Sequence, residues 1–284
     1  MPVFSNRFAI NATRRKLCSI NLDLAYASFT VPNILIYNLS SSSSSDLPQS
    51  SSSETSESSS SVLADYVDPS TVVKGTMTDE RDGQTYKTVT IGTQTWMAEN
   101  LNYAYTDVPY KHGNYTSDST SWCYKDSASY CTKYGRLYTW AAAMDSVGTW
   151  STNGKGCGYG TTCSPTYPVR GICPEGWHLP TKAEFETLFT AVGGKSTAGK
   201  VLKSTSGWNS SGNGSDAFAF SALPAGYRND LGDYLNEGYN AGYWSSTEYG
   251  SYNAYSMLLD YISADAGLGN ASKGLAFYVR CLRD

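Results

Sequence analysis

The sequence has few of the groups on which most enzymes and nucleic-acid-binding proteins depend. Only two of its 284 residues are histidine, charged residues make up 16%, and the formal net charge is −4. A chain this acidic lacks the cationic surface that neutralises phosphates, so neither nucleic acid nor an anionic membrane is an expected partner. It contains no Gly-x-Ser-x-Gly elbow, phosphate loop or dinucleotide fingerprint. No apolar run approaches the roughly eighteen residues of a membrane-spanning helix.

The composition divides the chain into a low-complexity tract and a region typical of a globular domain. Fifteen of the twenty-two residues from Ser40 to Ser61 are serine, and Leu47 is the only large apolar side chain among them. Such a tract buries too little apolar surface to offset its ordering entropy, so 40–61 is expected to be a disordered, serine-rich linker. A single domain is expected over 76–284, which is long enough for one sizeable core.

Residues 1–39 carry only part of the pattern of a secretion signal. Arg14-Arg15-Lys16 precedes an apolar stretch that ends in a small-x-small triplet, as in a signal peptide. Asn21 and Asp23 interrupt that stretch, and the charged residues 14–16 stand close before Cys18, the position for a lipid anchor. We interpret 1–39 as a leader-like segment, with a signal peptide, a lipid-anchored leader and a misassigned start as the alternatives.

Six of the seven cysteines lie in the predicted domain, and they indicate disulfides. Because no Cys-x-x-Cys pair occurs and histidines are scarce, disulfides are expected in place of a zinc or redox site, and with them an oxidising compartment. Six cysteines allow fifteen pairings. The spacing favours Cys123–Cys131 and Cys157–Cys163, which leaves Cys173–Cys281; that last bond contributes about 4 to 5 kcal/mol in the chain-entropy model. Secretion, or display on the cell surface, is the expected localisation.

The segment around Pro180 contains a complete signal for the start of a helix. Pro180 disfavours helical backbone angles at the preceding residue, and Thr181 with Glu184 is spaced to form a capping box. Gly193-Gly194 supplies the stop. Apolar residues follow the start at i, i+3, i+4 and i+7, namely Phe185, Leu188, Phe189 and Val192. The pattern predicts an amphipathic helix packed on a core.

The other expected elements are mainly strands. A hairpin is predicted over 84–101 with Gly92-Thr93 as its turn, followed by loop over 102–121. A short helix is expected over 137–144 and another helical turn over 198–203. Further strands are expected over 217–223, 225–228, 243–247, 254–261 and 275–282. In the last of these, alternation places Phe277, Val279 and Cys281 on one face and Tyr278, Arg280 and Leu282 on the other. Two helices, several strands and long loops predict an α+β domain.

Five ordered blocks over about 76–284 resemble the Fibrobacter succinogenes major paralogous domain. The blocks are Thr95-Trp96-Met97-Ala98-Glu99-Asn100-Leu101, Tyr134-Gly135-Arg136-Leu137-Tyr138-Thr139-Trp140, Cys173-Pro174-x-Gly176-Trp177-His178-Leu179-Pro180-Thr181, Gly242-Tyr243-Trp244-Ser245-Ser246-Thr247-Glu248 and Val279-Arg280-Cys281. The family's members are mostly taken to be secreted proteins or lipoproteins of undefined activity.

A more distant resemblance concerns the fold. Leu179-Pro180-Thr181-x-Ala183-Glu184-Phe185 is similar to a signature of the formylglycine-generating, sulfatase-modifying fold, which is related to C-type lectin-like domains. This resemblance implies a C-type-lectin-like or formylglycine-generating-enzyme-like α+β domain of short twisted antiparallel strands, two helices, long loops and disulfides. It implies a fold and not an activity.

Aromatic residues in loop-like surroundings favour a non-catalytic binding or adhesion function. Rings of this kind stack on sugars or anchor a protein partner, so the expected partner is a cell-surface polysaccharide or an envelope protein. The candidate ligand-binding residues are Trp208, Tyr227, Tyr239, Tyr243 and Tyr249; among them, Trp208 and Tyr239 are flanked by Gly, Asn and Ser and are expected at the surface. The alternatives are a copper-dependent, formylglycine-type oxidase, which by resemblance needs two thiolates, and a structural envelope component.

No catalytic residue and no firm cofactor emerge from the sequence. His112 lies in a loop-like stretch and His178 in the turn before the predicted helix, with no partner visible in the sequence, so neither is assigned as a base. Calcium is the one candidate cofactor, because Asn229, Asp230 and Asp233 offer oxygen ligands at short spacing. Turns are enriched in Asn and Asp for backbone reasons as well. The oligomeric state is left open.

Overall fold

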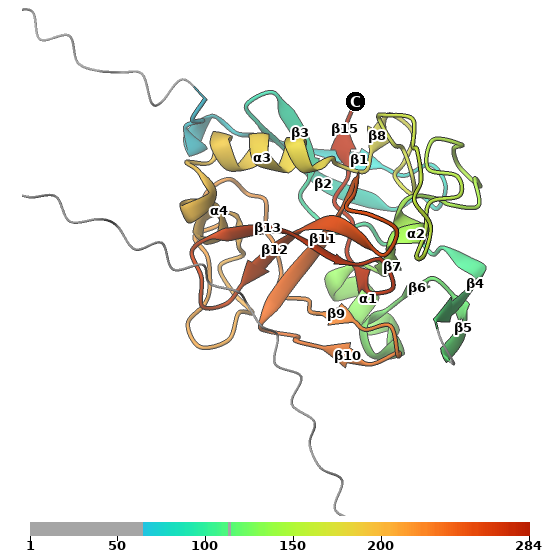
Figure 1. Ribbon diagram of the computed structural model, residues 1–284. Coiled ribbons are helices and arrows are strands. Elements are labelled where there is room, and N and C mark those ends of the chain that lie inside the picture. The colour runs from blue at the N-terminus through green and yellow to red at the C-terminus, as the bar shows by residue number, and fades with distance from the viewer. Residues whose placement is uncertain (1–64, 113–114) are drawn as a thin grey trace, which may run out of the picture. The chain divides into compact units, whose positions relative to one another are not determined.

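The computed structural model describes residues 65–112 and 115–284, so the expected leader and serine-rich linker lie outside the described residues. The elements in chain order are η1 (Pro69–Thr71), β1 (Val73–Thr78), β2 (Thr85–Ile91), β3 (Gln94–Met97), β4 (Thr106–His112), β5 (Tyr115–Ser119), β6 (Ser121–Trp122), η2 (Tyr124–Asp126), α1 (Ala128–Tyr134), β7 (Leu137–Thr139), α2 (Trp140–Ala143), β8 (Trp177–His178), α3 (Lys182–Ala191), α4 (Lys195–Leu202), β9 (Tyr227–Arg228), β10 (Tyr234–Leu235), β11 (Asn240–Glu248), β12 (Asn253–Asp260), β13 (Ala266–Ser272), β14 (Ala276–Phe277) and β15 (Leu282–Arg283). The fold is α+β, as the sequence predicts (Figure 1).

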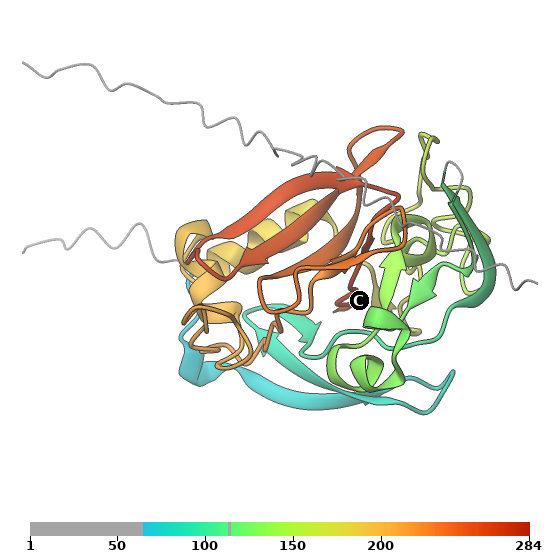
Figure 2. The same cartoon turned by 90° about the horizontal axis from the view of Figure 1, so that it is seen from below.

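The strands form four small antiparallel sheets. Their strand orders are β1-β2-β3-β15-β8, β10-β9-β14-β7-β6, β11-β12-β13 and β4-β5. The β11–β13 sheet packs its inner side against α3, as seen from below (Figure 2). In the part of the chain that the structure describes, no helix has both the length and the apolar character to cross a membrane.

The predicted hairpin and the predicted helix start are confirmed. β2 and β3 pair as Thr90 with Thr95 and Ile91 with Gln94, which leaves Gly92-Thr93 as a two-residue turn. At the start of α3, the Thr181 hydroxyl accepts a hydrogen bond from the Glu184 amide, and the Glu184 carboxylate accepts one from the Thr181 amide. This reciprocal capping box fixes where the helix begins.

The final segment divides its side chains between two halves of the core, as its alternation predicts. Phe277, Val279 and Cys281 pack into one buried cluster. Tyr278 and Leu282 pack into the other. Because a strand presents successive side chains on opposite faces, this one segment joins both halves of the core.

Three disulfides staple the domain, and they join the pairs that the spacing favours. Cys123–Cys131 and Cys157–Cys163 close short loops. Cys173–Cys281 ties the segment before β8 to the end of the chain across a sequence separation of 108 residues. A loop of that length carries the largest loop-closure entropy of the three.

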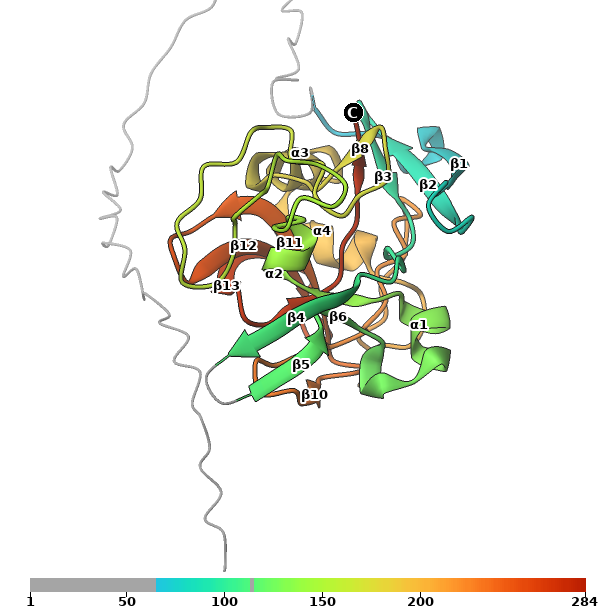
Figure 3. The same cartoon turned by 90° about the vertical axis from the view of Figure 1, so that its right-hand side faces the viewer.

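Three predicted stretches are wrong in whole or in part. The helix expected over 137–144 begins only at Trp140, because residues 137–139 form the strand β7. The expected loop over 102–121 contains the β4–β5 hairpin, which extends beside β6 (Figure 3). The expected strand over 217–223 is, among the described residues, only an isolated bridge at Ala222. Phe218 and Phe220 there are both buried, because Ala219 (φ 54°) and Ser221 (φ 54°) adopt left-handed backbone angles that break the extended chain.

Candidate ligand-binding surface

Trp208, which is expected at the surface, is instead buried, and its own loop packs around it. Its ring is 5% exposed, and its indole N–H donates to the Ser204 hydroxyl (3.1 Å) and the Ala222 carbonyl (3.2 Å). The Lys203 ammonium lies 4.9 Å from the ring centre. The loop therefore folds around this indole, and Trp208 is corrected from a candidate ligand contact to a structural residue.

Tyr243 is also buried, and Tyr227 is only partly accessible. Tyr243 in β11 is 0% exposed and lies against Phe220 and the Arg280 guanidinium. Tyr227 in β9 packs edge-on against Phe277, with ring centres 5.9 Å apart. Tyr243 is therefore corrected as well, since no ligand at the surface reaches its ring.

Tyr239 and Tyr249 are exposed, but they lie at opposite ends of one strand. They are 44% and 54% exposed and flank β11, a nine-residue strand. Such a strand spans about 30 Å at the usual rise per residue. Tyr239 packs edge-on against Tyr261, with ring centres 5.1 Å apart. The two candidates therefore do not share a site.

Tyr249 belongs to a group of tyrosines around the β11–β12 turn, which we call the tyrosine patch. It consists of Tyr159, Tyr249, Tyr252 and Tyr255. Tyr252, which is 57% exposed, packs edge-on against Tyr159 at 5.2 Å. Tyr249 packs edge-on against Tyr255 at 5.4 Å. The turn and the disulfide-closed loop 157–163 thus present their rings together.

A buried ion pair supports the patch from below. Glu248, the last residue of β11, accepts the Cys163 amide at 3.2 Å and pairs with Lys273. The Lys273 ammonium is fully buried, donates to the Thr161 carbonyl (2.9 Å) and lies 4.4 Å from the centre of the Trp140 ring. Because a buried pair is held only when its remaining hydrogen bonds are satisfied, these contacts fix the loop 157–163 against the turn.

The loop and the turn are also joined through their backbones. The Gly160 amide donates to the Ser251 carbonyl at 2.9 Å. A hollow of about 260 Å³ adjoins the patch at Tyr159 and is lined partly by hydroxyl-bearing side chains, among them Thr120, Thr139 and Ser146. The Thr120 hydroxyl is buried there without a hydrogen-bond partner in the described structure. The exposed rings therefore adjoin a hollow with a partly polar lining, in which Thr120 and Thr139 are themselves buried.

Sequence reasoning missed three of the four patch residues. Tyr159 stands between Gly158 and Gly160 in a short cysteine-closed loop, and Tyr252 stands in a Gly-Ser turn between two strands. Both contexts hold a ring at the surface, because short loops have no room to bury it. The sequence signal for an exposed ring was therefore a tyrosine at the tip of a short loop. An aromatic residue flanked by small polar residues was not a sufficient signal.

His178 has two partners, which corrects the expectation that it stands alone. Its ring nitrogens lie 2.7 Å from the Asp284 carboxylate (Nδ1) and 3.0 Å from the Glu184 carboxylate (Nε2). Burial opposes protonation, but the bonds to Glu184 and Asp284 outweigh it and raise the pKa of His178. Glu184, already part of the capping box, has its pKa lowered against the effect of burial by His178 and Thr181. The ring thus ties the helix start to the last strand.

The candidate calcium ligands Asn229 and Asp233 form hydrogen bonds that close a turn. The side-chain oxygen of Asn229 accepts the Leu231 and Asp233 amides at 3.0 and 2.7 Å, and its amide group donates to the Asp233 carboxylate at 3.0 Å. Asp230 lies in the same turn. Within residues 65–112 and 115–284, no group of three or more His, Cys, Asp or Glu side chains is placed to hold a metal ion. His112 lies in β4, and its side chain is outside the described structure.

The secondary structure and the three disulfides define the protein as a disulfide-linked α+β domain with a surface group of tyrosines. The chain belongs to the Fibrobacter succinogenes major domain family, whose model matches residues 89–283. The matched region begins inside β2, so β1 and the start of β2 precede it although they pair with it. A search of curated proteins finds no match to the chain.

Proposed function

We propose that the protein is a non-catalytic binding domain of the bacterial cell surface and that its tyrosine patch holds a polysaccharide. The observation that carries this proposal is that Tyr249 and Tyr252 are more than half exposed while each ring is held edge-on by another. Rings fixed before binding lose little conformational entropy when a ligand arrives. Their faces stack on the apolar faces of sugar rings, and their hydroxyls remain available for hydrogen bonds.

Two further properties form part of this proposal. We propose a C-type-lectin-like or formylglycine-generating-enzyme-like fold, supported by the α+β class, the short antiparallel strands and the long loops. We also propose secretion or attachment at the cell surface as a lipoprotein-like component. The three disulfides support this location, because such bonds persist in oxidising compartments.

The formylglycine-type oxidase is the weaker alternative. Soft copper sites of that kind need thiolate ligands, whereas all six cysteines of the domain are paired. Thiol titration of the unreduced protein is expected to find none of these six free. Two free thiols that bind Cu(I) tightly would favour the oxidase instead.

Retention on insoluble glycans tests the proposed function. We expect the full chain to sediment with at least one of cellulose, xylan, mannan and chitin, and the Tyr249→Ala/Tyr252→Ala variant to lose that retention by about tenfold or more, since two stacking contacts are removed. The matched control is Tyr239→Ala, which removes an equally accessible ring at the other end of β11. Equal losses in the control would contradict a role for the patch.

An envelope protein is the other candidate partner. If the wild type is retained on none of the four glycans, the polysaccharide proposal fails. Cross-linking from a photoreactive residue at position 252 then distinguishes the remaining possibilities. A discrete protein adduct there would assign the patch to a structural or adhesive contact with that protein.

A further inference from the structure

A second concave surface lies on a different face, among β2, the segment 98–104 and α1. Two adjoining hollows of about 380 and 390 Å³ share Gln84, Asn102, Cys131 and Thr132 in their linings. We call the two together the polar groove. Each volume lies within the roughly 300–1,000 Å³ of small-ligand sites. The groove contains no residue of the tyrosine patch, so it stands independently of the function proposed above.

The floor of the groove contains a buried cation that no carboxylate neutralises. Arg280 is 1% exposed. Its guanidinium donates to the Asn100 side-chain oxygen (2.6 Å), to the carbonyls of Met97 and Phe220, and to the Ser221 carbonyl (3.1 Å). Among the described residues no carboxylate pairs with it. Backbone carbonyls and the Asn100 side-chain oxygen bind the guanidinium in place of a paired carboxylate, so it contributes a positive potential to the groove above it.

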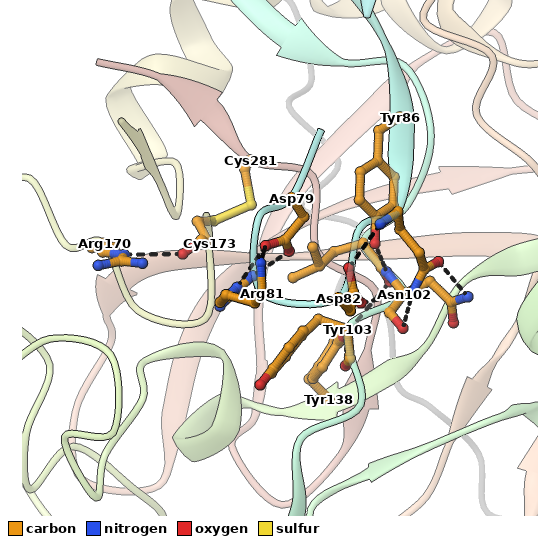
Figure 4. Close-up of polar contacts among 12 residues, drawn as sticks. Asp79, Arg81, Asp82, Tyr86, Asn102, Tyr103, Tyr138, Arg170, Cys173 and Cys281 are labelled. Carbon is orange, nitrogen blue, oxygen red and sulfur yellow. Dashed lines mark hydrogen bonds and ion pairs between the residues drawn. A yellow bond between two sulfur atoms is a disulfide. The ribbon is translucent and has the colours of Figure 1, made fainter. Parts of the chain in front are cut away.

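One wall of the groove presents an unused hydrogen-bond acceptor. Asn102 is held from two sides, because its backbone N–H donates to the Tyr86 hydroxyl and its side-chain amide donates to Gln84, both at 3.0 Å. Gln84 is itself held by Asp82 at 2.8 Å. Figure 4 shows Tyr86, Asp82 and Asn102 close together at this wall. The side-chain oxygen of Asn102 is buried without a donor in the described structure. A buried acceptor in this state is destabilising until a donor reaches it.

The rim is cationic in a protein that is acidic overall. Lys133 has a side chain that is 59% exposed and lies 3.7 Å from Glu237, and Arg136 lines the second hollow. Lys87 is balanced by Glu99 at 3.2 Å. Together the two hollows are lined by four cationic side chains (Lys87, Lys133, Arg136 and Arg280) and two carboxylates (Asp82 and Glu99). With Glu237, the partner of Lys133, included, four cations stand beside three carboxylates, which is a small positive excess in a chain whose net charge is −4.

We infer that the polar groove binds an acidic sugar, with its carboxylate at Lys133 above the buried Arg280 and a ring hydroxyl donating to the side-chain oxygen of Asn102. The remaining lining favours a hydroxylated ligand over an apolar one, because amides and hydroxyls such as those of Gln84, Thr85 and Thr132 predominate. A carboxylate adds a charge-assisted bond, which is stronger than a neutral one.

Calorimetric titration of the full chain with trigalacturonate tests the inference, with galactotriose as the neutral counterpart. We expect trigalacturonate to bind, galactotriose to bind at least tenfold more weakly, and the difference to shrink as salt screens the rim. Lys133→Met is expected to weaken trigalacturonate binding by about tenfold, since it removes one charge-assisted contact. Lys155→Met is the matched control: it removes the same charge from an exposed position that does not line the groove.

The result separates this groove from the tyrosine patch. Tyr249→Ala/Tyr252→Ala is expected to leave trigalacturonate binding unchanged, so loss of glycan retention and loss of acidic-sugar binding are independent outcomes. Equal affinity for the two trisaccharides, absence of trigalacturonate binding, or equal effects of Lys133→Met and Lys155→Met would each overturn the inference. Lys133 is exposed but also covers the Tyr134 ring and pairs with Glu237, so Lys133→Met is expected to lower the unfolding midpoint only slightly, and thermal denaturation checks that the variant is folded.

Discussion

Two groups of tyrosines in this domain use the same side chain in opposite ways. The first, which we call the tyrosine ladder, consists of Tyr124, Tyr130, Tyr134 and Tyr234 around η2, α1 and β10. Neighbouring rings in it have centres 5.2 to 5.8 Å apart. The second is the tyrosine patch at the β11–β12 turn, whose paired rings are a similar 5.2 to 5.4 Å apart. Ring spacing alone therefore does not distinguish a structural group from an accessible one.

What distinguishes the groups is the partners of the rings and hydroxyls. In the ladder, the Tyr130 and Tyr134 hydroxyls both donate to Glu237 at 3.1 Å. Lysines cover the rings, with Lys133 4.4 Å from the centre of Tyr134. In the patch, the supporting charges of Glu248 and Lys273 bind backbone and each other beneath the rings. The ladder uses its polar groups for stability, whereas Tyr249 and Tyr252 of the patch stay more than half exposed.

Truncation of the ladder gives the largest expected effect. Tyr134 is 4% exposed and packs on Tyr130, so Tyr134→Ala is expected to lower the free energy of unfolding by about 3 to 5 kcal/mol. Tyr134→Phe keeps the ring and loses only the bond to Glu237, which costs about 1 kcal/mol. Urea unfolding measures both. A similar loss for the two variants would show that the hydroxyl, and not the ring, carries the stability.

Neutralising Glu237 tests the polar side of the ladder. Burial alone would raise the pKa of Glu237, but hydrogen bonds from Tyr130, Tyr134 and Lys125 outweigh it and lower the pKa below its ordinary value of 4.5. The folded state therefore binds fewer protons than the unfolded state as pH falls below 4.5, and the stabilisation present above that value is lost through the folded pKa.

Glu237→Gln is accordingly expected to lower stability by about 1 kcal/mol at pH 7 and to approach the wild type in acid. Urea unfolding between pH 7 and pH 3 measures this convergence. Glu186→Gln is the control, because Glu186 is an exposed carboxylate paired with Lys182 on α3, where such pairs contribute about 0.5 kcal/mol or less. A constant difference between Glu237→Gln and the wild type at every pH would contradict the lowered pKa.

The sequence correctly predicted the structural features that depend on residues close together in the chain. The capping box at Thr181 and Glu184, the Gly92-Thr93 turn and the short-range cysteine pairs all depend on residues within ten positions of one another. The β4–β5 hairpin was missed because its residues lack a clear period. β13 was missed because it contains Gly267 and Gly269, which β-propensity disfavours; its pairing with β12 fixes it instead.

The candidate site was less predictable because burial is a property of the whole fold. Trp208 and Tyr249 both stand among small and polar residues, yet one is 5% and the other 54% exposed. Trp208 is the more buried of the two because the folded chain places Lys203, Ser204 and Ala222 against its indole ring. No local pattern reports such contacts. Of the two carboxylates around His178, Asp284 could not be foreseen for the same reason, since it lies 106 residues away, whereas Glu184 is only six residues away and was interpreted as a capping residue alone.

The smallest expected effect, and the clearest contrast with the ladder, is the stability of a patch variant. Tyr252 is 57% exposed, so Tyr252→Ala is expected to change the free energy of unfolding by about 0.5 kcal/mol or less, as surface substitutions do. Urea unfolding beside Tyr134→Ala provides the comparison. If Tyr252→Ala destabilised the domain by several kcal/mol, the patch would be a second ladder, and its rings would support the loop 157–163 instead of a ligand.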